Sequence, residues 1–257
     1  MEKRFGGKIA IVTGAAGDIG KTAALRFASE GAQVVAVDLH EEPLQAVVAD
    51  IEAAGGEALA VKADVTKSED VANYVEATMK RFGGADILFN NAGIEGPVAP
   101  LEEYPDEGFD QVIAVNVRGV FLGLKYVVPA MRSRNGGAIV NTASVAGLSG
   151  SPGIIGYNAS KHAVIGMTRS AAHDLAAENI RVNAVCPAPI MGRMMSSLEA
   201  GMSPDNPEEM HAVTEARIPM QRYGEPKEVI GLVTYLCSED ASFLTGGHYT
   251  VDGGFTA

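Results

Sequence analysis

Short apolar runs alternate with longer amphipathic stretches along most of the chain. The apolar runs, rich in Val, Ile and Ala, predict buried strands, which fall at residues 8–13, 33–38, 57–64, 85–93, 136–144, 180–187 and 247–254. The stretches between them carry apolar residues at helical spacing and predict helices at residues 18–32, 41–56, 68–84, 106–134, 157–179 and 226–240. Repetition of strand, helix and strand predicts an α/β fold, a doubly wound parallel seven-stranded sheet with helices on both faces.

One segment, residues 188–222, interrupts this alternation and is rich in Pro, Met and Ser. It follows the end of a predicted strand, and ligands bind beyond the carboxyl ends of the strands in sheets of this kind. The chain shows no linker composition and no short repeat, and its 257 residues are an ordinary length for one α/β domain. We therefore expect a single domain over residues 1–257.

Composition and charge narrow the class of protein. Aromatic residues make up 6% of the chain and Trp is absent, which suits a sheet core of Val, Ile, Leu and Ala. The formal charge of −12 opposes binding to nucleic acid or to anionic lipid. Cys186 and Cys237 have neither metal-binding nor redox spacing. The N-terminus lacks the apolar region of a signal peptide, and no apolar stretch is expected to reach membrane-spanning length. We predict a cytoplasmic protein with no nucleic-acid partner and no membrane partner.

The sequence TGAAGDIG at residues 13–20 joins the first predicted strand to the first predicted helix. In that context Gly14 suits a tight turn, and Gly20 suits close packing of the helix on the strand. The helix would offer its free N–H groups and its positive dipole end to a diphosphate. The pattern predicts a dinucleotide site, although glycine turns of this kind also serve structure alone.

Asp38 ends the second predicted strand, about twenty residues beyond the glycine turn, where a carboxylate can accept hydrogen bonds from ribose hydroxyls. It would also repel a 2′-phosphate, and VDLHEE contains no Arg or Lys beside it. We therefore expect NAD (NADH) as the cofactor rather than NADP. Asp64, which ends the third strand, and the Asn90-Asn91-Ala92-Gly93 run after the fourth can line the same cleft.

Tyr157 and Lys161 lie four residues apart at the start of a predicted helix, so their side chains share one face. A cation held near a phenol favours the phenolate and lowers its pKa from about 10. Such a tyrosine can act as general acid or base near neutral pH. This spacing is common by chance, so its chemical meaning depends on the rest of the chain.

Several motifs agree in order and spacing: TGAAGDIG, Asp38, NNAG, Asn116 in AVNVRG, Ser144 in NTASVAG, the YNASK run from Tyr157 to Lys161, and IRVNAVCP followed by API. On these residues the chain resembles the short-chain dehydrogenase/reductase family over essentially its whole length. The resemblance implies a Rossmann-type fold and an NAD(H)-dependent oxidoreductase that interconverts a secondary alcohol and a ketone. NNAGIEG, RGVFLGL, NTASV and RYGE resemble the NAD-dependent cyclic ketone and diol dehydrogenases of the levodione reductase type.

The resemblance implies a role for each catalytic residue. Tyr157 would exchange the proton with the substrate oxygen, and Ser144 would hydrogen-bond that oxygen. Lys161 would bind the nicotinamide ribose and lower the Tyr157 pKa, and Asn116 would kink its helix and hold a water that links Lys161 to solvent. The expected cofactor-binding residues are Gly14, Gly17, Asp18, Ile19, Gly20, Asp38, Leu39, Asp64, Val65, Asn91, Ala92, Gly93, Tyr157, Lys161, Pro187 and Ile190.

The resemblance also implies that the segment at about 188–222 is a substrate lid. It contains six of the ten methionines, Met191, Met194, Met195, Met202, Met210 and Met220. Flexible thioethers form adaptable apolar walls, so we expect an apolar or alicyclic substrate, unless these residues only pack the lid onto the body. The predicted substrate pocket comprises Glu95, Ser144, Val145, Ile154, Tyr157, Met191 and Met195.

Asp18, Ala188 and Gly192 depart from the family pattern, and all bear on cofactor binding. The family has glycine where Asp18 and Ala188 stand, and often threonine where Gly192 stands. A carboxylate about 5 Å from a phosphate charge would cost about 3 kcal/mol at an effective dielectric constant of about 20. We therefore expect the Asp18 side chain to turn outward and cap the helix that it begins.

Other functions stay open at this point. A 3-oxoacyl-carrier-protein reductase belongs to the same family, but such enzymes usually use NADPH and offer basic residues to an acidic carrier, against which Asp38, Glu178 and the charge of −12 argue. A non-catalytic NAD-binding protein could share the fold, although the catalytic set is intact. The histidines form no cluster with acids at ligand spacing, so we predict no catalytic metal. The resemblance implies a homotetramer, with helices at 106–134 and 157–179 in one interface and the C-terminal helix and strand in another.

Overall fold

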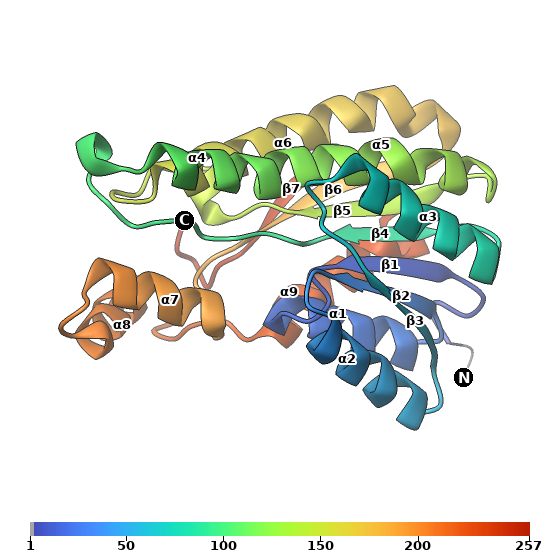
Figure 1. The fold of residues 1–257 in the computed structure, drawn as a ribbon, viewed down its shortest axis with the longest axis horizontal. Helices are drawn as coiled ribbons and strands as arrows, with labels where there is room; N and C mark the ends of the chain where they lie inside the picture. The colour runs from blue at the N-terminus through green and yellow to red at the C-terminus, as the bar shows by residue number, and fades with distance from the viewer. Residues whose placement is uncertain (1–2) are drawn as a thin grey trace.

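Seven parallel strands form one sheet at the centre of the computed structural model, which describes residues 3–257 (Figure 1). Their order in space is β3-β2-β1-β4-β5-β6-β7. The strands are β1 (Ile9–Thr13), β2 (Gln33–Asp38), β3 (Glu57–Lys62), β4 (Ile87–Asn90), β5 (Gly137–Thr142), β6 (Ile180–Pro187) and β7 (His248–Val251). The winding reverses between β1 and β4, and such a reversal opens a crevice at the carboxyl ends of the strands.

Helices cover both faces of this sheet (Figure 1). They are α1 (Asp18–Ser29), α2 (Glu41–Ala53), α3 (Ser68–Phe82), α4 (Asp106–Ile113), α5 (Gly119–Arg132), α6 (Ile155–Leu175), α7 (Arg193–Met202), α8 (Pro207–Ala216) and α9 (Pro226–Cys237), with a π-helical turn η2 (Ala114–Arg118) and 3-10 turns at Leu101–Glu103, Val145–Gly147, Ala176–Glu178 and Glu239–Ala241. Helices α1, α2 and α9 lie on one face, and α3, α5 and α6 lie on the other.

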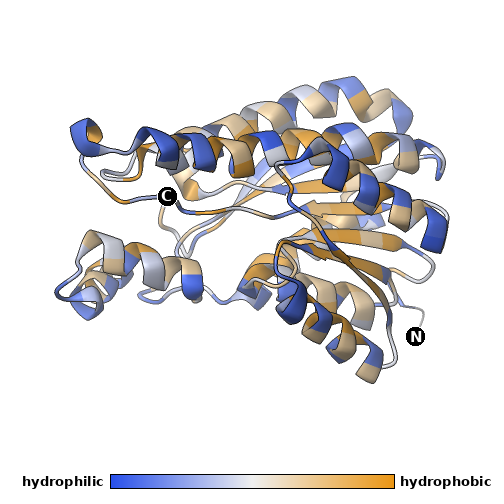
Figure 2. Ribbon diagram, viewed as in Figure 1, coloured by the Kyte–Doolittle hydropathy of each residue, from blue (hydrophilic) through white to orange (hydrophobic). Residues whose placement is uncertain are grey.

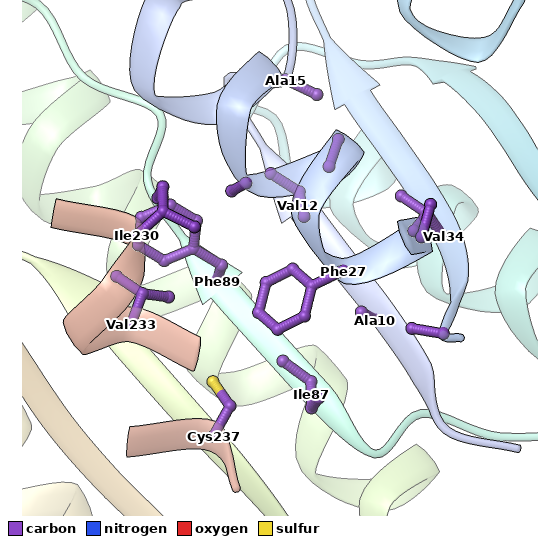
Figure 3. Packing of buried hydrophobic residues seen from close by; sticks show 14 of the residues in the cluster. Ala10, Val12, Ala15, Phe27, Val34, Ile87, Phe89, Ile230, Val233 and Cys237 are labelled. Atoms are coloured by element: carbon purple, nitrogen blue, oxygen red, sulfur yellow. The ribbon is translucent and has the colours of Figure 1, made fainter. Parts of the chain in front are cut away.

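Alternation along each strand divides the core into two layers. In β1, Ala10 and Val12 point toward α1 and α9, whereas Ile11 points toward α3, α5 and α6. Figure 3 shows part of the first layer, where Phe27 of α1 and Val233 of α9 pack over the sheet. Apolar residues run through the central strands, and polar residues lie on the outer sides of the helices (Figure 2). Burial on both faces explains why the strands appear in the sequence as nearly continuous apolar runs.

The predicted fold class is confirmed, and the strands at 33–38 and 180–187 match to the residue. The segment at 188–222 is a correction, because it contains two helices, α7 and α8, where the sequence indicated irregular chain. Both are short, and they stand apart from the two helical layers, on the side that carries the C-terminus (Figure 1). Leu198 of α7 is buried against Ile154 and Tyr157, and Asn206 caps α8, so packing on the body and a local cap define the two helices.

The continuous helical stretch Asp106–Arg132 is long and apolar enough to cross a membrane by length and composition, with a mean hydropathy of 1.5 over an 18-residue window. The prediction that no stretch has this property was therefore wrong. Half of that window is buried inside the structure. Its apolar residues Val112, Val120, Leu122, Val127 and Met131 are buried, so core packing accounts for their hydrophobicity.

Candidate active site

The glycine turn brings β1 against the start of α1. A Cβ atom on Gly20 would overlap the Gly14 carbonyl oxygen, so helix and turn approach more closely than any other residue permits. The N-cap of α1 is Gly17, which has no side chain to satisfy the N–H groups of the first turn. The turn therefore has both the close approach and the free donors that a diphosphate requires.

Asp38 lies at the end of β2 with both carboxylate oxygens fixed by backbone donors. Its Oδ2 accepts the N–H of Ala16 at 3.0 Å, and its Oδ1 accepts the N–H of His40 at 3.0 Å. Each oxygen has further lone pairs, so the carboxylate can still accept hydroxyl groups from the cleft. The sequence placed this residue correctly at the strand end, and the two bonds explain its orientation.

The NNAG segment is tied to two strands. The Thr13 hydroxyl accepts the N–H groups of Asn91 and Ala92 at 2.9 and 3.0 Å. The Asn91 side-chain amide donates to the Thr13 carbonyl at 3.1 Å, and its oxygen accepts the Thr142 hydroxyl at 3.1 Å. These bonds hold the segment across the ends of β1 and β5, which forms the floor of the crevice.

Tyr157 and Lys161 lie on the first turns of α6, beside Ser144 at the end of β5. The Lys161 ammonium is 5.4 Å from the centroid of the Tyr157 ring and donates to the Thr142 carbonyl at 2.8 Å. The Ser144 hydroxyl accepts the N–H of Ala146 at 3.1 Å, which fixes its position. Tyr157, Lys161 and Ser144 are each less than 10% exposed, so the three groups form one buried polar site.

Burial dominates the acid–base properties of this site. It raises the pKa of Tyr157 to about 12, while a hydrogen bond with Ser144 lowers it and the charge of Glu95 raises it further. Burial also lowers the pKa of Lys161 to about 8. Loss of hydration is the largest cause at Tyr157, and the expectation that Lys161 lowers the Tyr157 pKa stays a prediction.

Asn116 is fully buried in the π-helical turn between α4 and α5. Its side-chain oxygen accepts the N–H of Ile94 at 2.9 Å, and its amide donates to the Ile94 carbonyl at 2.8 Å and to the Ser160 hydroxyl at 3.0 Å. A π turn in an α-helix commonly marks a functional position. The π turn interrupts the α-helix at Asn116, and the side chain joins the segment after NNAG to α6 beside Lys161.

A cavity of about 1110 Å³ unites these groups. All of the expected cofactor-binding residues line it, as do Ser144, Val145, Ile154, Tyr157, Met191 and Met195. Among the described residues, Glu95 does not line it, nor does Met220, although Met194, Met202 and Met210 do. Glu95 lies near enough to Tyr157 for its charge to act there, but it does not form the wall, so its place in the predicted pocket was wrong.

Several wall residues were not predicted from the sequence. They are Val98 and Ala99 after the NNAG loop, Leu198 on α7, Val213 and Arg217 from α8 and its end, and Phe255 near the C-terminus. Leu198 could have been found, because it follows Met194 and Met195 at helical spacing. The sequence around Phe255 gave no sign of its role, because a turn beyond β7 brings this side chain to the cavity.

A buried polar cluster joins α7 to α8. Glu199 accepts the Tyr223 hydroxyl at 2.6 Å and pairs with the His211 ring at 2.9 Å. The rings of His211 and Tyr223 lie 4.2 Å apart. This cluster fixes the two helices to each other and to the chain before α9. Within residues 3–257, no group of three His, Cys, Asp or Glu side chains is arranged to hold a metal ion.

The prediction that Asp18 caps its own helix was wrong. Gly17 is the N-cap of α1, and Asp18 is the first residue of that helix. The Asp18 carboxylate instead accepts the N–H of Arg193, the first residue of α7, at 2.9 Å. Local sequence could not show this bond, since it links residues 175 positions apart.

Comparison with known proteins places the chain among oxidoreductases. The family model described as enoyl-(acyl carrier protein) reductase matches residues 14–256. Cyclohexanol dehydrogenase of Acinetobacter sp. (strain SE19) is 43% identical, covering 100% of this chain and 98% of that protein. Levodione reductase of Leifsonia aquatica is 40% identical over 99% and 96% of the two chains, and a 3-oxoacyl-[acyl-carrier-protein] reductase of Thermotoga maritima is 41% identical over 98% of each.

Solved structures agree with these relatives. The crystal structure of levodione reductase matches with a TM-score of 0.95 and 40% identity over 98% of each chain. NAD+-bound xylitol dehydrogenase matches with the same TM-score and identity, over 98% of this chain and 100% of that one. The resemblance found in the motifs therefore extends to the whole fold.

Proposed function

The chain belongs to the short-chain dehydrogenase/reductase family, and on that premise we propose that it is an NAD(H)-dependent enzyme that interconverts an apolar secondary alcohol and its ketone. The observation that carries this proposal is the single cavity in which the glycine turn, the polar set of Ser144, Tyr157 and Lys161, and an apolar wall meet. These three parts would bind the cofactor, transfer the proton and hold the substrate.

The residues of this chain fit a dinucleotide. The glycine turn with its free N–H groups would hold the diphosphate, and Asp38 would accept the adenosine ribose hydroxyls. Asp64, Val65 and the NNAG segment would flank the adenine and the second ribose, and Pro187 and Ile190 would lie near the carboxamide. When bound, the nicotinamide supplies the hydride acceptor for alcohol oxidation and the hydride donor for ketone reduction.

Tyr157 would hold or take the proton at the substrate oxygen. In ketone reduction its O–H donates to the carbonyl oxygen, and a pKa raised to about 12 keeps that proton in place at neutral pH. Ser144 would donate a second hydrogen bond to the same oxygen. In alcohol oxidation the phenolate must form, so we expect oxidation to be favoured by alkaline pH.

Lys161 and Asn116 would complete the proton path. The Lys161 ammonium lies between the Tyr157 ring and the Thr142 carbonyl, where it can bind a ribose hydroxyl. Its pKa of about 8 allows it to exchange a proton near neutral pH. Asn116 would hold a water that links Lys161 to solvent, through which the proton leaves the site.

The apolar wall supports a substrate of low polarity. Val98, Ile154, Met194, Met195 and Leu198 converge beside Tyr157, where Ile154 and Leu198 are buried. An alicyclic ring would bury its carbons against these side chains, at about 25 cal/mol for each Å² of apolar surface removed from water. The names of two relatives, cyclohexanol dehydrogenase and levodione reductase, agree with a cyclic substrate.

Reduction of an acyl-carrier-bound ketone is the second candidate, favoured by the Thermotoga maritima relative. An acidic carrier would approach a protein of formal charge −12. Arg132, a basic residue that could contact the carrier, is already paired at 2.7 Å with Glu178 in the 3-10 turn after α6. Charge repulsion therefore disfavours this partner.

The test follows the absorbance of NADH or NADPH with cyclohexanone, linear ketones and an acetoacetyl thioester, using Tyr157→Phe as the control. Activity with NADH on cyclic ketones that is lost in the Tyr157→Phe variant would support the proposal. Preference for the thioester with NADPH would replace it with the second candidate. An absence of turnover together with tight NADH binding would favour a non-catalytic NAD-binding protein.

We also propose a homotetramer in the cytoplasm. Large apolar side chains are exposed on two surfaces, Phe109, Phe121 and Ile155 on α4, α5 and α6, and Tyr235 and Phe243 beside α9. Exposed apolar groups of this size commonly mark protein interfaces. Light scattering coupled to gel filtration gives the mass, and a monomer at micromolar concentration would overturn the tetramer.

A further inference from the structure

Two of the residues that depart from the family pattern, Asp18 and Gly192, are in contact. Asp18 begins α1, and Gly192 is the N-cap of α7. A Cβ atom on Gly192 would overlap the Asp18 carboxylate and lie 2.9 Å from its Cγ atom. Gly192 also has a φ of 151°, which side chains rarely adopt. A side chain at 192 is therefore incompatible with the observed position of Asp18.

The Asp18 carboxylate serves as the cap that α7 otherwise lacks. Gly192 has no side chain, and the N–H of Arg193 donates to the Asp18 Oδ2 at 2.9 Å. A carboxylate at a helix N-terminus satisfies a free donor and interacts favourably with the helix dipole. The start of α7 is thus capped from another element, the glycine turn, rather than from its own chain.

The two ends of this bond belong to different parts of the cavity. Asp18 lies in the wall with Gly17 and Ile19 of the glycine turn, whereas α7 carries Met194, Met195 and Leu198 of the apolar wall. Among the described residues, the bond to the Arg193 N–H is the hydrogen bond by which the Asp18 side chain joins these two walls. One carboxylate therefore connects the diphosphate-binding turn to the helix that covers the substrate.

We propose that Asp18 is a positioning residue that holds α7 over the cavity, and that Gly192 is glycine because it leaves room for this carboxylate. The cap ties the substrate lid to the glycine turn, so it slows release of the cofactor and fixes the apolar wall. The effect on cofactor rests on the proposed function, whereas the effect on α7 does not.

Hydrogen–deuterium exchange of the cofactor-free protein tests the contact directly. We compare wild type with Asp18→Gly, Asp18→Asn and the control Asp174→Asn, which removes the same charge from an exposed position of α6. In Asp18→Gly, the amides of the first turn of α7 should exchange about fivefold faster, the value of one capping side chain. Asp18→Asn keeps an acceptor oxygen and should stay within about twofold of wild type. Equal exchange in Asp18→Gly and wild type would overturn the proposal.

The rate of NADH release gives an independent readout. Loss of the cap should speed release about fivefold in Asp18→Gly and raise the KM for the alcohol. If Asp18 acted only by repelling the diphosphate, both Asp18→Gly and Asp18→Asn would bind NADH more tightly than wild type, and this result would also overturn the proposal. A protein that fails to bind NADH contradicts the proposed function and leaves the exchange experiment valid.

Gly192→Ala supplies the reciprocal test. In wild type the added Cβ would overlap the Asp18 carboxylate, so either α7 or the carboxylate must move and the capping bond is lost. Hydrogen exchange in the first turn of α7 should therefore rise about tenfold. In the Asp18→Gly background the clash is absent, so the same substitution should have a clearly smaller effect. Additive effects of the two substitutions would show that the residues act separately.

Discussion

Replacing Lys161 by methionine should stabilise the protein while removing its activity. Lys161 is 4% exposed, and among the described residues its ammonium has a single hydrogen-bond partner, the Thr142 carbonyl at 2.8 Å. Methionine has a similar length and no charge, so it can fill the same space in α6 without a buried cation. The proposed mechanism requires that cation, whereas the folded structure does not.

The magnitude follows from the pKa of Lys161. Burial lowers it from 10.5 to about 8. One pKa unit corresponds to about 1.4 kcal/mol, so the buried ammonium destabilises the fold by about 3 kcal/mol below pH 8. Loss of the bond to Thr142 removes about 1 kcal/mol of stability. We therefore expect a net gain of about 2 kcal/mol at pH 7.

The gain must also depend on pH in one direction. Between pH 8 and pH 10.5 the unfolded chain binds more protons at Lys161 than the folded protein does, so wild-type stability rises with pH in this window. The variant has no such group. Its advantage should be largest below pH 8, and it should disappear by pH 10.5.

The assay is urea unfolding at fixed protein concentration from pH 7 to pH 10.5, because assembly makes stability depend on concentration. Lys80→Met removes an exposed lysine of α3 and is the control. It should change the free energy of unfolding by less than about 0.5 kcal/mol at every pH. A Lys161→Met protein that is less stable than wild type at pH 7, or whose advantage does not vary with pH, would refute the reasoning.

Three further substitutions test the cofactor site, the lid and the π turn. Asp38→Ala should raise the KM for NAD at least about tenfold and reduce the preference for NAD over NADP, because a charged acceptor for the ribose hydroxyls is lost. An unchanged ratio of the KM values for NAD and NADP would contradict this prediction. Tyr223→Phe removes the 2.6 Å bond to Glu199, and limited proteolysis should cleave residues 188–222 several-fold faster than in wild type, with a stability loss of about 1 kcal/mol. Asn116→Ala removes both bonds to Ile94 and should lower kcat at least about tenfold and stability by about 2 kcal/mol; steady-state kinetics with urea unfolding checks both.

The parts of the fold that the sequence predicts well are those defined by local periodicity. A parallel strand buried on both faces gives a continuous apolar run, and the strand at 180–187 was therefore located to the residue. The helices α7 and α8 were not predicted because they are short and depend on contacts with residues distant in the sequence. Glu199 and Tyr223 illustrate this, since each would be expected at the surface and both are buried together.

The candidate site divides in the same way. The motifs located Asp38 and Ser144 at the carboxyl ends of two strands of one parallel sheet, which lie at the same edge, and Tyr157 at the start of a helix that reaches this edge. Their electrostatics could not be predicted, because a pKa depends on hydration that only the folded chain determines. Burial is the largest cause of the raised pKa of Tyr157, and no spacing in the sequence shows how deeply that side chain is buried.

Asp18 and Gly192 show what a one-dimensional pattern omits. Considered singly, each is a departure that should weaken the grip on the cofactor, one by charge and the other by a missing hydroxyl. In the structure the carboxylate occupies the space that a side chain at 192 would need, and it satisfies the donor that follows Gly192. The two changes therefore compensate each other, because either one alone would leave α7 uncapped or in collision. A sequence comparison that treats positions as independent would score both as defects, whereas the contact makes them one feature of the site.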